Sequence, residues 1–185
     1  MMGVTLEVKR LSVPNVLSLS RVFFIPAILI LLSMGGRYDL LASLLFLLAA
    51  FTDLADGLVA RKFNSITPLG KLLDPLADKL LVCLSLIMLV HLRRAPAWIV
   101  VLIVARELIV TGIRAEGRER GKIIGARTSG KLKAVIQYLA IFCLCIWKGI
   151  QGIPFDMLGR ILLWAALFLT LYSGLSMILD SLKER

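Results

Sequence analysis

Four aspartates lie close together in the segment DLADGLVARKFNSITPLGKLLDPLAD, which runs from Asp53 to Asp78. Long apolar runs flank it on both sides, and an ionised carboxylate beside hydrocarbon is costly unless a partner neutralises it. Asp53 and Asp56 are three residues apart, and Asp74 and Asp78 are four apart, so each pair shares one face of a helix. Such a cluster needs cations, and divalent ions that prefer oxygen ligands suit it.

The spacing further predicts that the two pairs face each other across a helical hairpin. Asp53 lies eight residues before Arg61, and Asp78 lies eight residues after Gly70. At about 1.5 Å per residue, both lie roughly 12 Å into their helices, and the other aspartate of each pair lies one turn shallower. Two metal ions held there would clamp a phosphoryl group. A salt-bridged hairpin and a proton- or cation-conducting path are the alternatives.

Small residues accompany the acids on the first of these helices. Gly57 and Ala60 follow Asp56 and remove side-chain bulk beside the carboxylates, as a flat ligand lying against the helix requires. Arg61 follows at the predicted helix end, where a guanidinium can bind phosphate oxygens through two hydrogen bonds. Close helix packing is the alternative explanation for the two small residues.

The composition indicates an all-α integral membrane protein. Of the 185 residues, 59% are hydrophobic, and the mean hydropathy is +0.90, whereas a soluble domain has apolar residues at about half of its positions. A span takes about 20 mostly apolar residues. We expect a single domain over residues 1–185 that begins with a short amphipathic segment on the membrane surface, Val4–Ser12. Six transmembrane helices are predicted over residues 15–34, 40–61, 71–92, 98–114, 132–148 and 157–182.

The net charge of +10 is distributed over the connections between these segments. It therefore indicates membrane topology and anionic headgroups, not nucleic acid. Lys and Arg gather near both termini and in the second and fourth connections, so these parts are predicted to be cytoplasmic, in the inner or plasma membrane of a bacterium. Arg21, Lys79 and Arg106 lie inside predicted spans and need anionic partners.

The acidic segment resembles the signature of a known family. The pattern D-x-x-D-G-x-x-A-R, then eight residues, then G-x-x-x-D-x-x-x-D, is similar to that of the CDP-alcohol phosphatidyltransferases, and every fixed position is occupied. The resemblance implies a six-span enzyme over essentially the whole chain, with two divalent cations, Mg²⁺ or Mn²⁺. Asp53, Asp56 and Asp74 would hold them, with Asp78 as a further ligand and as the general base.

The resemblance also implies a site for the CDP part of the donor. Gly57 and Ala60 would admit the cytidine, and Arg61 would bind the pyrophosphate. The segment PNVLSLSR is similar to the family's P-N-x-L-T-x-x-R, with serine in place of threonine, which adds Asn15; a helix cap after Pro14 is the alternative. The full set implied for CDP binding is Asn15, Asp56, Gly57, Ala60, Arg61 and Gly70.

Basic residues around the fourth connection bear on the acceptor alcohol. Arg106 and Arg114 lie on the fourth predicted span, and Lys131 and Lys133 enter the fifth. Such a basic mouth suits an acceptor that carries a phosphate, and positive-inside topology is the alternative for most of these charges. The Arg-Glu pair at residue 106, and GKLKAVIQ beside G-K-x-K-T-x-x-Q, resemble the members that use glycerol 3-phosphate, with alanine where threonine is usual.

The implied reaction moves the phosphatidyl group from CDP-diacylglycerol to sn-glycerol 3-phosphate, giving phosphatidylglycerophosphate and CMP. Inositol phosphate, inositol and serine are alternative acceptors, and a cation or proton transporter is the alternative from another class. A transporter predicts broken helices or pseudo-symmetric halves, whereas the acids here lie in one half of the chain. The family implies a homodimer in the lipid. The sequence leaves the dimer face, the metal and the acyl-chain preference open.

Overall fold

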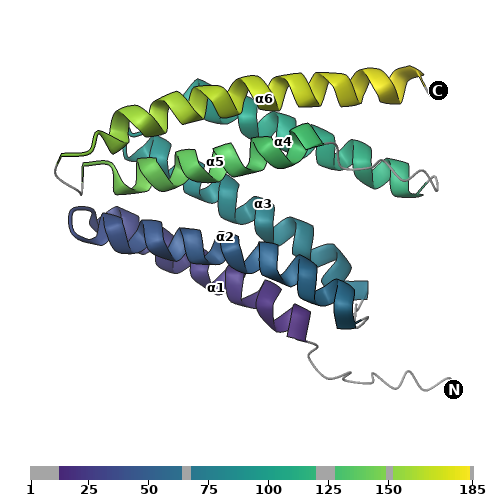
Figure 1. Cartoon of the computed structure of the whole chain (residues 1–185), viewed down its shortest axis with the longest axis horizontal. Coiled ribbons are helices and arrows are strands. Elements are labelled where there is room, and N and C mark those ends of the chain that lie inside the picture. Colours follow the sequence, from purple (N-terminus) through teal and green to yellow (C-terminus); the bar gives the residue numbers. More distant parts are fainter. Residues whose placement is uncertain (1–12, 64–67, 120–127, 149–151, 184–185) are drawn as a thin grey trace, which may run out of the picture.

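The computed structural model contains six α-helices and, in the part of the chain that it describes, no strand (Figure 1). It describes the backbone of residues 13–63, 68–119, 128–148 and 152–183, and the side chains of residues 23–52, 79–114, 117, 132–148 and 152–178. The helices are α1 (Val13–Met34), α2 (Tyr38–Phe63), α3 (Pro68–His91), α4 (Ala97–Glu119), α5 (Thr128–Ile146) and α6 (Phe155–Lys183). Each covers one predicted segment, and the prediction of six helices is confirmed.

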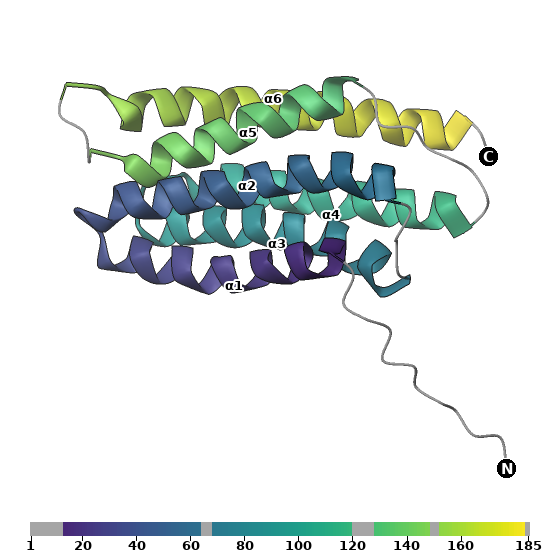
Figure 2. The same ribbon diagram turned by 60° about the horizontal axis from the view of Figure 1, so that its bottom comes forward.

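The helices run back and forth along one direction, so their connections gather at two ends (Figures 1 and 2). The end of α2, the start of α3, the end of α4 and the start of α5 lie at one end, here called the site end. The start of α1 and the end of α6 lie there too. The turns that follow Met34, His91 and Ile146 lie at the opposite end, here called the far end.

Local backbone chemistry ends the helices at the far end. Gly35 follows α1 with a φ of 64°, and its N–H donates to the carbonyl oxygen of Leu31 at 3.2 Å. This left-handed cap satisfies a carbonyl that the helix end leaves without a partner. Arg93 and Trp147 take similar φ values, 57° and 54°, after α3 and α5.

The core lies where α1, α2, α3 and α5 meet, and it extends to α4 and α6. Its largest fully buried side chains are Phe46, Ile28, Leu32, Leu81, Leu86, Leu89, Ile99, Ile103, Ile141, Leu144 and Ile146. Every helix also exposes large apolar side chains, including Phe23, Phe51, Ile87, Leu108, Leu132 and Phe168. An apolar outer surface of this extent marks a membrane or interaction surface.

One helix stretch, Phe155–Ile178, is long and apolar enough to cross a membrane by length and composition. Within the described residues, the other apolar stretches are shorter: Phe23–Met34, Tyr38–Thr52, Lys79–His91 and Leu132–Ile146. The crossing of a membrane by all six helices, and the side on which the termini lie, therefore stay predictions. The predicted surface segment, Val4–Ser12, lies outside the described residues.

A buried ion pair holds the far end together. Arg94 donates through Nη2 to both carboxylate oxygens of Asp39, at 2.9 and 2.8 Å, and both residues are buried. Its Nη1 donates to the carbonyl oxygen of Cys145 at 2.7 Å. The guanidinium thus ties the start of α2 and the turn before α4 to the end of α5. The ring of Trp147 lies beside it, with the guanidinium carbons of Arg94 and Arg160 at 5.9 and 5.1 Å from the ring centroid.

Candidate active site

The four aspartates that the sequence predicts as metal ligands lie on two helices that meet at the site end. Asp53 and Asp56 belong to α2, and Asp74 and Asp78 belong to α3. Because both segments are helical, the spacing places each pair on one helix face. Only residues 64–67 separate the two helices, so the helix ends are at most roughly 18 Å apart at about 3.6 Å per residue.

The carboxylates of this hairpin are suitable ligands for a divalent cation, since Mg²⁺ and Mn²⁺ prefer carboxylate oxygens. The side chains of the four aspartates lie outside the described residues. In the part of the chain whose side chains are described, no three His, Cys, Asp or Glu side chains come together as a metal site. The metal prediction therefore rests on these four aspartates.

The positions predicted to bind CDP lie on three neighbouring helices. α1 packs against both α2 and α3. Asn15 is in the first turn of α1, which begins at the site end. The side chains at all the positions predicted to bind CDP lie outside the described residues, so their contacts with a ligand stay predictions. The remaining positions are Gly57, Ala60 and Arg61 in α2 and Gly70 in α3.

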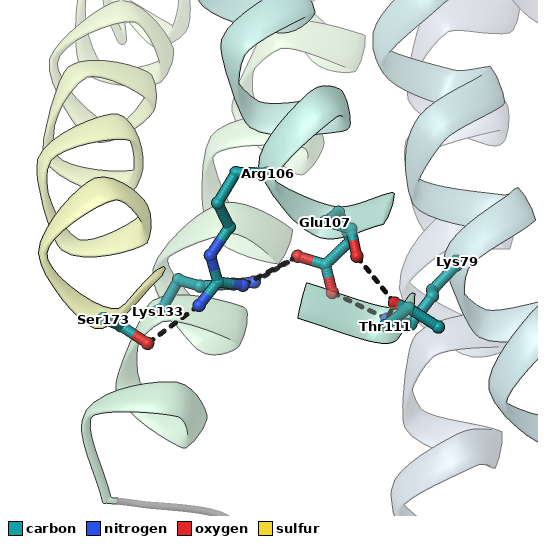
Figure 3. Close-up of polar contacts among 6 residues, drawn as sticks. All are labelled: Lys79, Arg106, Glu107, Thr111, Lys133 and Ser173. Atoms are coloured by element: carbon teal, nitrogen blue, oxygen red, sulfur yellow. Dashed lines mark hydrogen bonds and ion pairs between the residues drawn. The ribbon is translucent and has the colours of Figure 1, made fainter. Parts of the chain in front are cut away.

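A cluster of buried and half-buried charges joins α3, α4, α5 and α6, with Glu107 at its centre (Figure 3). Lys79 Nζ donates to Glu107 Oε1 at 3.1 Å, and Arg106 Nη1 donates to Oε2 at 3.2 Å. Lys133 Nζ also donates to Oε2. On the other side of the guanidinium, Arg106 Nη2 donates to Ser173 Oγ at 2.8 Å. We call Lys79, Arg106, Glu107 and Lys133 the charge cluster.

The backbone of α4 supports this arrangement. Lys79 Nζ also donates to the hydroxyl of Thr111, and that hydroxyl donates to the carbonyl oxygen of Glu107 at 2.6 Å (Figure 3). Thr111 is one helical turn after Glu107, so both project toward α3. The ammonium group of Lys79 is therefore fixed by two partners on one helix.

The charge cluster carries more positive than negative charge. Three cations share one carboxylate among the described residues, which leaves two positive charges uncompensated there. Arg106 is 9% exposed and Lys133 is 6% exposed. Buried cations are unfavourable without anionic partners, so these two charges need an anion from outside the described residues.

One member of the charge cluster is the sequence neighbour of the predicted general base. Lys79 directly follows Asp78 in α3, so their Cα atoms are about 3.8 Å apart. The prediction that cations inside the apolar segments have anionic partners is confirmed for Lys79 and Arg106, which both bind Glu107. Arg21 lies outside the described side chains.

The structure brings together two of the four residues predicted to bind the acceptor. Arg106 and Lys133 meet at Glu107. Arg114 lies two turns further along α4, half-buried, and its Nε has no hydrogen-bond partner among the described residues. The side chain of Lys131 lies outside them.

Sequence reasoning did not single out Ser173 or Thr111, and it read Glu107 only as part of a motif. The signal for Ser173 was available, because Thr170, Ser173 and Gly174 interrupt the apolar sequence of α6. Polar and small residues in such a segment commonly face another helix.

A family model described as CDP-alcohol phosphatidyltransferase matches residues 11–172. The chain belongs to the CDP-alcohol phosphatidyltransferase family. The matched part contains all four aspartates and the whole charge cluster. The resemblance of the acidic segment to this family is therefore confirmed, and the hairpin of α2 and α3 carries the family's signature.

Several curated relatives carry the name CDP-diacylglycerol–glycerol-3-phosphate 3-phosphatidyltransferase, including the following three. The protein of Bacillus subtilis (strain 168) is 37% identical over 180 aligned residues, covering 88% of this chain and 91% of the relative. That of Rickettsia bellii (strain RML369-C) is 38% identical over 167 residues, covering 89% and 92%. That of Wigglesworthia glossinidia brevipalpis is 36% identical over 145 residues, covering 75% and 79%.

Proposed function

We propose that the protein is a phosphatidylglycerophosphate synthase. It transfers the phosphatidyl group from CDP-diacylglycerol to sn-glycerol 3-phosphate and releases CMP. The observation that supports this acceptor is the charge cluster, in which one carboxylate binds three cations among the described residues. A phosphate monoester carries a charge of about −1.5 to −2 at pH 7, which balances that excess. The names of the relatives describe the same reaction.

The donor site belongs to the hairpin of α2 and α3. Two divalent cations, Mg²⁺ or Mn²⁺, held by Asp53, Asp56, Asp74 and Asp78, would supply charge neutralisation at the pyrophosphate of CDP-diacylglycerol and at the departing CMP. The remaining donor contacts are proposed for the set Asn15, Asp56, Gly57, Ala60, Arg61 and Gly70. Among these, Gly57 and Ala60 leave space for the cytidine, and Arg61 binds phosphate oxygens.

The protein's own groups arrange the displacement. Arg106 and Lys133 bind the phosphate of glycerol 3-phosphate. Arg114 and Lys131 also bind the acceptor, and they lie nearer the site end. This binding brings the free hydroxyl toward Asp78, which accepts its proton. The hydroxyl oxygen then bonds to the phosphorus that carries the diacylglycerol, the bond from that phosphorus to the bridging oxygen of CMP breaks, and CMP leaves with the bonding electrons.

We further infer that all six helices span the inner or plasma membrane of a bacterium, with the site end and both termini in the cytoplasm. The apolar side chains exposed on every helix support the lipid environment. The concentration of Lys and Arg at the site end supports the orientation. This placement gives a lipid donor and a soluble acceptor access to the same site, and a homodimer is the assembly that the family implies.

The experiment is CMP release by the detergent-purified protein supplied with CDP-diacylglycerol and Mg²⁺ or Mn²⁺. Glycerol 3-phosphate, inositol, inositol phosphate and serine are tested separately, with Asp78→Asn as the control. We expect release with glycerol 3-phosphate, dependent on the metal and lost in the variant. Release with a different alcohol would overturn the acceptor assignment. No metal-dependent release with any acceptor, from folded protein, would overturn the enzyme and favour a transporter.

A further inference from the structure

Two consecutive residues of α6 contact the side chain of Arg106. Ser173 Oγ accepts a hydrogen bond from Arg106 Nη2 at 2.8 Å, and both residues are 9% exposed (Figure 3). Gly174 is also buried. A Cβ atom built on it would lie 2.9 Å from Arg106 Nε and 3.0 Å from Arg106 Cγ. Since real Cβ atoms essentially never come this close, only glycine at this position lets Arg106 lie where it does.

The guanidinium is therefore held from two sides. Its Nη1 binds the carboxylate of Glu107, its Nη2 binds Ser173, and its Nε lies against Gly174 without a hydrogen-bond partner among the described residues. A guanidinium is planar and presents its donors in a fixed fork. Fixing two of its nitrogens and its stem consequently fixes the direction in which the remaining N–H bonds point.

We propose that Ser173 and Gly174 are positioning residues of the acceptor site, which orient Arg106 toward the phosphate of the acceptor. The proposal rests on the proposed function, because it gives Arg106 that ligand. Neither residue contacts the substrate in this account; both act through Arg106. They also lie beyond residues 11–172, the part of the chain that the family model matches.

A second glycine of α6 provides a matched control. Gly159 is buried too, and a Cβ atom built on it would lie 2.8 and 2.9 Å from the Leu144 side chain and 3.0 Å from the Leu144 backbone nitrogen. This close contact joins α6 to α5 near the far end, away from the charge cluster. Gly112 of α4 provides a second control, since a Cβ atom there has nothing within 4 Å among the described residues.

The test compares steady-state kinetics and melting temperatures of Gly174→Ala, Ser173→Ala, Gly159→Ala and Gly112→Ala in detergent. Displacing or loosening a charge-assisted contact is expected to raise KM for glycerol 3-phosphate about ten-fold in Gly174→Ala. The KM for CDP-diacylglycerol should stay at the wild-type value. Ser173→Ala should change KM in the same direction by a smaller factor. Gly159→Ala should lower the melting temperature and leave both KM values unchanged. Gly112→Ala should also leave both KM values unchanged and should not lower the melting temperature, because alanine is the better helix former.

A double-variant cycle shows whether Gly174 acts through Arg106. Alanine at position 106 has neither Cγ nor Nε, so the methyl group of Gly174→Ala then meets no Arg106 side chain. We expect Gly174→Ala to add nothing to Arg106→Ala, in KM or in melting temperature. If Gly174→Ala does not fold, the KM for glycerol 3-phosphate is measured in Ser173→Ala alone, because this substitution adds no bulk.

Different outcomes separate this inference from the proposed function. If the wild-type protein releases no CMP with glycerol 3-phosphate, the proposed function fails. If the wild type is active but Gly174→Ala and Ser173→Ala keep its KM for glycerol 3-phosphate, the positioning inference alone fails. It also fails if Gly174→Ala further raises the KM of Arg106→Ala, or if it behaves like Gly159→Ala.

Discussion

The helix bundle buries two arginines, Arg94 at the far end and Arg106 in the middle of α4, and the two differ in how their charge is balanced. At the far end, Arg94 has one carboxylate to itself and binds both of its oxygens, with a backbone carbonyl as a further partner. In the charge cluster, Arg106 shares the single carboxylate of Glu107 with two lysines. Among the described residues the first arginine is balanced by its own carboxylate, whereas the charge cluster needs a further anion from outside them.

This difference separates a structural role from a binding role for residues of the same type. Buried ionisable groups that lack a full set of partners are common at functional sites, where the missing partner is the ligand. Arg94 and Asp39 should therefore determine the stability of the fold, and the charge cluster should determine the affinity for the acceptor. Each of the predictions below changes one of these two sites and measures stability, the KM for the acceptor, or both.

The largest expected effect is on stability at the far end. Asp39→Ala leaves Arg94 buried without its carboxylate, and removing one partner of a buried pair costs about 3–5 kcal/mol. The melting temperature in detergent should fall strongly, while the KM for glycerol 3-phosphate of the remaining folded protein stays unchanged. Asp156→Ala, in the first turn of α6, is the control and should cost at most about 1 kcal/mol. A changed KM in Asp39→Ala would contradict the separation of roles.

A smaller effect is expected when the central carboxylate of the charge cluster is neutralised. Glu107→Gln removes the one counter-charge that the three cations have among the described residues, at a cost of about 1–3 kcal/mol. Inorganic phosphate should then raise the melting temperature of this variant, because a ligand that binds only the folded state stabilises it. Asp39→Ala also removes an anion, but at the far end, which phosphate is not expected to reach, so phosphate should not raise the melting temperature of this variant. Equal stabilisation of the two variants by phosphate would mean that the charge cluster and the far end do not differ in anion binding.

The smallest effect concerns the aromatic ring at the far end. Trp147→Leu removes the ring that lies beside Arg94 and Arg160, and a cation–π contact contributes about 0.5–1 kcal/mol at exposed sites and about 2 kcal/mol when it is desolvated. We expect a small decrease in melting temperature and unchanged kinetics. If the decrease equals that of Asp39→Ala, the ring and not the ion pair holds this end together.

The positions of the six helices could be predicted from the sequence because apolar runs of sufficient length dominate it. The largest error is at the end of α4, which continues to Glu119 although the prediction ended at Arg114. The extra residues are AEGRE, and their charges suggested a connection. Ala, Glu and Arg are nonetheless good helix formers, so the helix extends beyond the apolar part.

The candidate site could be predicted where burial alone sets the requirement. A cation inside an apolar helix needs an anion, and this predicted that Lys79 and Arg106 would have partners. This requirement could not predict that Glu107 binds Lys79, Arg106 and Lys133 together. Lys79 and Lys133 are 28 and 26 residues away from Glu107 in the sequence. Such contacts depend on how α3, α4 and α5 pack.

The ion pair between Asp39 and Arg94 was missed for the same reason. Its members are 55 residues apart. Each belongs to the polar surroundings of a turn, where the sequence suggested only topology. Ser173 and Gly174 could not be assigned either, since their proposed role depends on the close approach of α6 to Arg106.

The central claim is that the charge cluster binds the phosphate of the acceptor, and Lys133→Met tests it most directly. Methionine keeps much of the length of the buried side chain and removes its charge. The measurement is the KM for glycerol 3-phosphate together with the inhibition constant of inorganic phosphate as a competitor. The account predicts that both rise by the same factor, roughly 10- to 100-fold for one charge-assisted hydrogen bond, while the melting temperature does not fall. Unchanged constants with a strongly lowered melting temperature would make the charge cluster a structural element like the far end, and would contradict the account.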